Sequence, residues 1–133
     1  MKYLKPEQVL FIHARLIAKT GGSHGILDLA RLEAAVSRPQ AGFQNQEMYS
    51  DIFLKAAALL DALVNDHPFI DGNKRTGISS AALFLRANGW RLEASNEELV
   101  EFTLKVAVSH PDLTLLAEWF QKQSSRMQAD SSR

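Results

Sequence analysis

His67-Pro68-Phe69-Ile70-Asp71-Gly72-Asn73-Lys74-Arg75-Thr76-Gly77, hereafter the motif segment, lies between two mostly apolar segments, residues 50–65 and 76–88. In each of these segments apolar side chains recur over most of a helical circumference, which predicts a helix buried on several sides. We therefore expect a central helical hairpin that holds the motif segment rigidly at its junction. The polar exceptions in the first helix are Asp51, Lys55 and Asp61.

The first helix of this hairpin should end just before the motif segment. Pro68 disfavours the helical conformation at the residue before it, so we expect the helix to stop at about Asp66, with the imidazole of His67 at its mouth. An unperturbed imidazole has a pKa of about 6.5 and is largely neutral near neutral pH. His67 is therefore a candidate general base for a hydroxyl group.

The second helix should begin inside the motif segment. Asp71 and Gly72 are typical of a helix start, because Asp is a good cap and Gly allows a sharp turn. The backbone amides of Gly72, Asn73 and Lys74 would then point out of the helix without partners inside it. The helix dipole and the cations of Lys74 and Arg75 favour an anion there, and a phosphate is the natural occupant. Asp71 adds a carboxylate oxygen of the kind that Mg²⁺ binds.

Each of these features also has an ordinary structural interpretation. A single histidine is commonly structural, an Asp before a Gly is commonly a turn, and a Lys-Arg pair is commonly solvated surface. Five such polar residues within nine positions, however, are a poor way to build a core and a good way to line a cleft. Phe69 is assigned a structural role, as an apolar anchor for the loop. The remaining histidines are assigned to structural or exposed positions: His13, His24 and His110.

The pattern His-Pro-Phe-x-Asp-Gly-Asn resembles the signature of the Fic/Doc superfamily, a small all-α domain with this motif between two central helices. Most Fic enzymes continue it as Gly-Arg-x-x-Arg and transfer AMP from ATP to a hydroxyl of a target protein. Here Lys74 stands at the Gly position and Ile78 at the second Arg position. Asn-Lys-Arg is similar instead to the Doc branch, the death-on-curing toxins of toxin–antitoxin pairs. Gly72 departs from the Doc pattern, which has Ala there.

The resemblance implies a particular reaction for this chain. Doc toxins transfer the γ-phosphoryl group of ATP to a threonine of elongation factor Tu, a translation protein. By this resemblance His67 is the general base and Asp71 binds the Mg²⁺ that bridges the phosphates of ATP. The nucleotide-binding residues would be Gly72, Asn73, Lys74 and Arg75, and the last two would also neutralise charge in the transition state. A long cation at position 74 would crowd the pocket that Fic enzymes use for the α- and β-phosphates, which favours a different nucleotide pose.

Three functions remain open at this point. The first is a phosphotransferase toxin that acts on translation, and the second is a Fic-type enzyme that transfers AMP to a target hydroxyl. The third is a non-catalytic binding domain that kept the cleft. Lys74 and Ile78 favour the first, and the presence of both His67 and Asp71 argues against the third. The resemblance also implies a cognate antitoxin, whose C-terminal segment we expect to fold as a helix in a groove of this domain.

Composition restricts the setting in which such a protein works. With 133 residues and 46% hydrophobic content, the chain predicts a single domain over residues 1–123, followed by a polar tail, residues 124–133, that we expect to be disordered. Fifteen basic and fifteen acidic residues give a net charge of zero, which argues against direct nucleic-acid binding. The absence of cysteine suits a cytoplasmic protein, and no apolar run approaches the length of a membrane span.

The other parts of the chain predict a compact all-α bundle of about six helices. A further helix should run from Pro6 to the Gly21-Gly22 turn, and another from an Asp28 cap to a point before Pro39. Residues 39–49 lack helical spacing and predict a loop or short hairpin. In the family the corresponding segment is a β flap that holds the extended backbone of the target, so the resemblance implies a similar docking edge here, with an ordinary connector as the alternative. The remaining expectations are a Ser50 cap, a strand over residues 90–93, and helices from Ser95 to Ser109 and after Pro111-Asp112.

Overall fold

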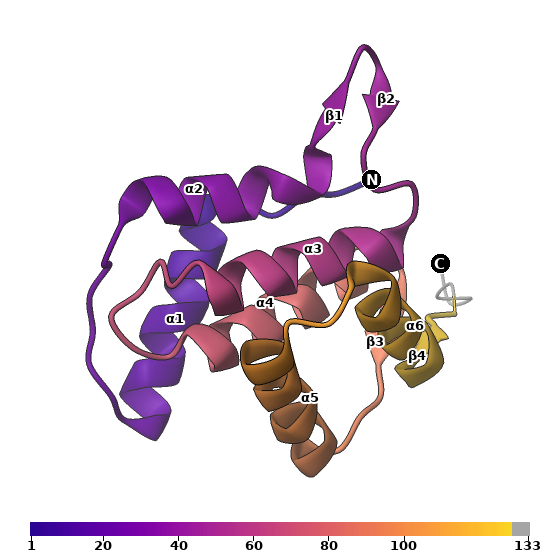
Figure 1. Ribbon diagram of the computed structural model, residues 1–133. Coiled ribbons are helices and arrows are strands. Elements are labelled where there is room, and N and C mark those ends of the chain that lie inside the picture. Colours follow the sequence, from indigo (N-terminus) through magenta and orange to yellow (C-terminus); the bar gives the residue numbers. More distant parts are fainter. Residues whose placement is uncertain (129–133) are drawn as a thin grey trace.

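The computed structural model describes residues 1–128, and in this range six α-helices surround a buried core (Figure 1). The predicted all-α bundle with a small β hairpin is confirmed. No helix in the described range is long and apolar enough to cross a membrane. In chain order the elements are α1 (Pro6–Thr20), α2 (Leu29–Ser37), the 3-10 helix η1 (Arg38–Gln40), β1 (Gly42–Phe43), β2 (Gln46–Glu47), α3 (Ile52–Asn65), α4 (Asn73–Ala87), β3 (Trp90–Leu92), α5 (Asn96–Ser109), α6 (Leu113–Gln123) and β4 (Ser124–Arg126).

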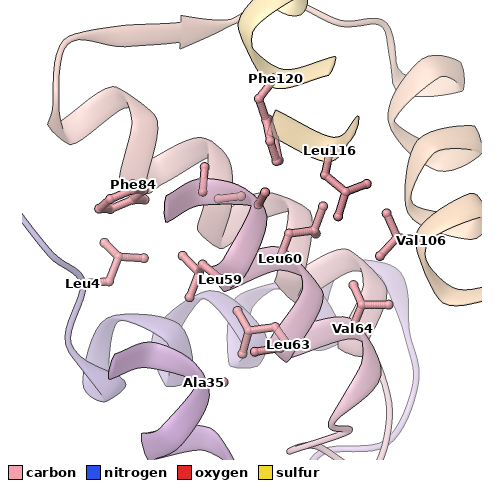
Figure 2. Close-up of a cluster of buried hydrophobic side chains, with 14 of the residues drawn as sticks. Leu4, Ala35, Leu59, Leu60, Leu63, Val64, Phe84, Val106, Leu116 and Phe120 are labelled. Carbon is pink, nitrogen blue, oxygen red and sulfur yellow. The ribbon is translucent and has the colours of Figure 1, made fainter. Parts of the chain in front are cut away.

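Helices α3 and α4 form the predicted central hairpin, and α3 is covered in addition by α2 and α6. Gly77 on α4 lets the two helices approach closely, because a Cβ at this position would lie only 3.0 Å from Val64 and 3.2 Å from Leu60 of α3. Figure 2 shows the leucines of α3 in the middle of the core, between side chains of α4, α5 and α6. Each fully buried leucine contributes about 1.5–3 kcal/mol, so this packing fixes both ends of the loop between α3 and α4.

Lys55 corrects the expectation that it would be a polar exception on α3, because its side chain is fully buried. Its Nζ donates to the carbonyl of Pro39 at 3.0 Å and to the carboxylate of Glu47 at 3.1 Å. Burial lowers the pKa of Lys55, but hydrogen bonds to Tyr3 and Glu47 outweigh this effect and raise it. The charge is therefore kept, and it ties η1, before the hairpin, and β2, within it, to the first turns of α3.

The hairpin itself is a two-residue turn between two short antiparallel strands. Gln44 and Asn45 both have positive φ, as a tight hairpin turn requires. In Figure 1 the hairpin projects from the N-terminal end of α3, whereas the motif segment begins at the C-terminal end of this helix. At about 1.5 Å per residue, α3 separates the two by roughly 20 Å.

Two further expectations were wrong. Asp51, and not Ser50, caps α3, because its Oδ1 accepts hydrogen bonds from the amides of Phe53 and Leu54. The polar tail was expected to be disordered from Ser124, but residues 124–126 form β4, which pairs with β3. The backbone hydrogen bonds of this pairing do not require apolar side chains, which explains why the polar sequence did not reveal it. Residues 129–133 of the predicted tail lie outside the described residues.

Candidate active site

Helix α3 ends at Asn65, one residue before the predicted position and two residues before the motif segment begins. His67 is exposed and has a φ of +49°, so it turns the chain in the left-handed region rather than in the extended region expected before a proline. It lines a shallow hollow of about 320 Å³ together with Asn65, Asp66 and Arg31 of α2. Arg31 donates to the carbonyl of Asp66 at 3.3 Å, and its position beside His67 was not predicted from the sequence.

The carboxylate of Asp71 is held by two backbone amides. Its Oδ1 accepts from Gly72 at 2.8 Å, and its Oδ2 accepts from Ser23 at 3.2 Å. These hydrogen bonds, first that of Ser23 and then that of Gly72, lower the pKa of Asp71, and the nearby Arg75 and His13 add to the effect. The group is therefore a fixed anion at neutral pH.

This carboxylate fits the requirements of a Mg²⁺–nucleotide. Residues 1–128 contain no group of three or more metal-binding side chains that could hold an ion by themselves. Mg²⁺ does not need such a group when ATP is present, because it is commonly held by one or two carboxylates together with substrate phosphates. Each oxygen of Asp71 accepts one hydrogen bond and keeps a lone pair for a metal ion.

The N-terminus of α4 differs in one respect from the predicted anion site. Gly72 is the N-cap with a φ of +80°, but its amide is already bonded to Asp71 and is not free for a phosphate. Among residues 1–128, the amides of Asn73 and Lys74 show no acceptor. The exposed cation of Lys74 lies at the same helix end. Two of the three predicted amides therefore remain available to an anion.

The side chain of Asn73 serves the loop itself. Its Oδ1 accepts from the amide of Phe69 at 3.0 Å, and its Nδ2 donates to the carbonyl of Phe69 at 3.0 Å. Phe69 is only 1% exposed, as the anchor role assigned to it requires. The loop between His67 and Gly72 is thus fixed by the two hydrogen bonds between Asn73 and Phe69 and by the burial of Phe69 in the core.

Arg75 points back to the loop after α1. Its guanidinium donates to the hydroxyl of Thr20 and to the carbonyl of Gly21. Gly22 follows with a φ of +113°, and a Cβ there would lie 2.6 Å from Oδ2 of Asp71. The Gly21-Gly22-Ser23 sequence favours a turn, with close approach of its glycines to a ligand as the alternative, and in the structure it forms one wall of the site. The contact of the Ser23 amide with Asp71 was not predicted from the sequence.

The structure brings most of the predicted residues together. Asp71, the start of α4 and Arg75 form one cluster against the loop after α1. His67 lies at the other end of the same short loop, and no hydrogen bond or salt bridge within residues 1–128 joins its side chain to that cluster. A ligand that contacts both His67 and this cluster must therefore extend along the outside of the loop.

An exposed histidine after one central helix, and an acidic residue with a glycine cap at the start of the next, define a domain of the Fic/Doc type. The model of the Fic/DOC family matches residues 3–85, and the chain belongs to this family. It is 34% identical to "Protein kinase doc" of Escherichia phage P1 over 122 residues, which cover 92% of this chain and 95% of that protein. It is 44% identical to "Toxin Doc" of Mycolicibacterium smegmatis (strain ATCC 700084 / mc(2)155) over 93 residues, covering 70% and 69%. These relatives confirm the predicted Doc branch.

Proposed function

We propose that this protein is a Doc-like toxin that transfers the γ-phosphoryl group of ATP to a Ser or Thr hydroxyl of a translation protein, with elongation factor Tu as the expected target. The observation that carries the proposal is the short anchored loop. It presents the exposed imidazole of His67 at one end and, at the other, a carboxylate beside two amides that have no acceptor within residues 1–128. A similarity to one relative named a protein kinase and another named a toxin supports it.

In this reaction His67 acts as the general base. The target hydroxyl loses its proton to the imidazole, its oxygen forms a bond to the γ-phosphorus, and the bond to the bridging oxygen breaks so that ADP leaves. The amides of Asn73 and Lys74 and the cations of Lys74 and Arg75 stabilise the charge on the phosphate oxygens. Asp71 would hold Mg²⁺, which neutralises phosphate charge when bound.

If the β1–β2 hairpin binds the backbone of the target protein, the target must extend from the hairpin to the motif segment. The β1–β2 hairpin and the motif segment lie at opposite ends of α3, roughly 20 Å apart. An extended chain covers about 3.3 Å per residue, so about six residues of the target would span this distance. We therefore propose that the acceptor hydroxyl lies about six residues from the part of the target that pairs with the hairpin.

Labelled ATP tests the reaction directly. The protein is incubated with purified elongation factor Tu, or with a cell extract, and with ATP labelled at either the α or the γ position. We expect label on the target only from the γ position. Label from the α position would overturn the kinase assignment in favour of AMP transfer, and mass spectrometry of the target would then show an added AMP instead of a phosphate.

His67→Asn is the sharpest test of the general base. Asn tolerates the left-handed conformation of position 67 better than most residues, so this variant removes the base with little strain in the loop. Loss of a general base lowers the rate by about 10²- to 10⁴-fold, and growth arrest on expression should be lost with it. Equal arrest by His67→Asn and wild type would instead support a non-catalytic binding domain.

A cytoplasmic toxin of this kind requires an antitoxin, and we propose that its C-terminal segment binds as an amphipathic helix along the exposed side of α1. A hollow of about 580 Å³ there is lined by Arg15, Leu16, Ala18 and Lys19, and the ring of Phe11 is 62% exposed nearby. Apolar and acidic side chains on one helix would match this surface. Arg15→Glu combined with Lys19→Glu should weaken binding of the partner encoded beside the toxin, and unchanged binding would place the partner elsewhere.

A further inference from the structure

We propose that His13, on α1, is a positioning residue of the candidate site, which fixes the direction of the Asp71 carboxylate. The identity of the ligand that uses this carboxylate rests on the proposed function. The geometry by which His13 acts on the carboxylate does not rest on the proposed function, because this geometry is a property of the protein alone.

His13 is almost completely buried, with 4% of its surface exposed, and it lies directly under the motif segment. Its ring stacks on that of Phe69, with 3.8 Å between the ring centroids and an angle of 5° between the planes. Its Nε2 lies 2.8 Å from the carbonyl oxygen of Asp71. A carbonyl oxygen only accepts hydrogen bonds, so Nε2 carries the proton and donates it.

This single hydrogen bond affects the orientation of the Asp71 carboxylate through one rigid peptide unit. The carbonyl of Asp71 and the amide of Gly72 belong to the same peptide unit, which is planar. When His13 holds the oxygen, the direction of the Gly72 N–H is fixed as well, because it lies in the same plane, on the opposite side of the C–N bond. That N–H donates to Oδ1 of Asp71 at 2.8 Å. The orientation of the carboxylate is therefore set from α1, over a separation of 58 residues in sequence.

The turn also packs directly on α1. A Cβ at position 72 would lie 3.1 Å from Cδ1 of Ile17 and 3.6 Å from Cδ2 and Nε2 of His13. The backbone of Gly72 thus rests against the same imidazole that holds the preceding carbonyl. His13 supports the peptide between Asp71 and Gly72 by packing as well as by hydrogen bonding, and the absence of a side chain at position 72 allows this close approach to α1.

An ordinary core histidine would affect stability only, and the two roles make different predictions. Groups that orient a metal-binding side chain typically change metal affinity or activity by about 10- to 100-fold when they are removed. His13→Phe keeps an aromatic ring against Phe69 and removes the donor, whereas His13→Gln keeps a donor and removes the ring. Val9→Ala is the matched control, because Val9 is a fully buried residue one turn earlier on the same helix.

The first measurement needs no ligand. The amide resonances of Ser23 and Gly72 report on the Asp71 carboxylate, because both amides donate to it. In nitrogen–proton correlation spectra we expect His13→Phe to move both resonances towards their positions in Asp71→Ala. His13→Gln should restore them in part, and Val9→Ala should leave them in place. Wild-type positions in His13→Phe would overturn the proposal, whatever the protein binds.

The second measurement addresses the ligand. Binding of Mn²⁺ together with a non-hydrolysable ATP analogue is followed by electron paramagnetic resonance at a temperature where all variants are folded. His13→Phe should weaken Mn²⁺ binding about tenfold and His13→Gln less, while Val9→Ala should stay within twofold of wild type. Equal affinity in His13→Phe and wild type would overturn the positioning role. Shifted amides together with no Mn²⁺–nucleotide binding by wild type would support the positioning role and refute the proposed function.

Discussion

Asn73→Ala should destabilise the protein through the loop, even though the replaced side chain lies at a helix start where alanine is well tolerated. The wild-type side chain makes two hydrogen bonds with the backbone of Phe69, both 3.0 Å long. Each is worth about 0.5–1.5 kcal/mol, and the better helix propensity of alanine returns about 0.5 kcal/mol. The net loss should be about 0.5–2.5 kcal/mol, which lowers Tm by roughly 2–10 °C for a domain of this size.

Asn96→Ala is the matched control, because Asn96 is the first residue of α5 as Asn73 is of α4, and it makes no side-chain hydrogen bond within residues 1–128. Its free energy of unfolding should stay within about 0.5 kcal/mol of wild type. Both variants are compared by denaturant unfolding followed by circular dichroism. Equal stability of Asn73→Ala and Asn96→Ala would show that the bonds to Phe69 do not hold the loop, and the assignment of Asn73 to the loop would be wrong.

Three further predictions concern the surroundings of the site and the hairpin. Because the pKa of Asp71 is lower in the folded protein than its ordinary value of 3.8, the carboxylate stabilises the fold above that pH and loses this effect as pH falls through the folded pKa. Asp71→Asn should therefore show a flatter dependence of stability on pH below about 4 than wild type, and parallel curves in acid titration would contradict this. Gly22→Ala and Gly21→Ala both place alanine at positive φ, at a cost of about 1–3 kcal/mol each, but only Gly22→Ala puts a Cβ against the carboxylate of Asp71. Kinase assays should therefore show a larger loss for Gly22→Ala, and equal losses would argue against the loop after α1 as a wall of the site. Lys55→Met leaves the carbonyl of Pro39 without its donor and should lower the free energy of unfolding by about 1–3 kcal/mol; a change below 0.5 kcal/mol in urea titration would show that this clamp is dispensable.

Much of the fold could be predicted because its signals are local. The spacing of apolar residues indicates the helices, and Pro68 and Gly72 mark the ends of α3 and α4 on either side of the loop. The Ser95 capping box is also present as predicted. These features depend on residues within a few positions of one another, so the sequence pattern alone contains them.

The errors arose where distant segments meet. Lys55 is buried because Pro39 and Glu47, brought to it by the hairpin, provide acceptors for its charge. The tail from Ser124 is partly ordered because β3 offers it a strand edge. Helical spacing gives no information on either contact, since both depend on how the chain returns to α3 and α4.

In the candidate site, too, the local features could be predicted from the sequence and the contacts between distant segments could not. The motif segment indicated Asp71 and the residues around it, but not the supports that come from other elements. His13 and Ser23 lie 58 and 48 residues away from Asp71 along the chain, and each contacts it by one hydrogen bond. A buried histidine on an amphipathic helix and a serine after two glycines carry no distinctive spacing. Only the packing of α1 against α4 places them in the site.

The pairing of β4 with β3 has a practical consequence for shortened versions of this chain. A truncation after Gln123 would remove the three residues that cover β3 and also the hydrogen bond from Met127 to the carbonyl of Gly89. The bare edge next to Trp90 would then be free to pair with the same edge of another molecule. Such a truncation should aggregate on concentration, although it cuts the sequence at a point that looks like the end of the last helix.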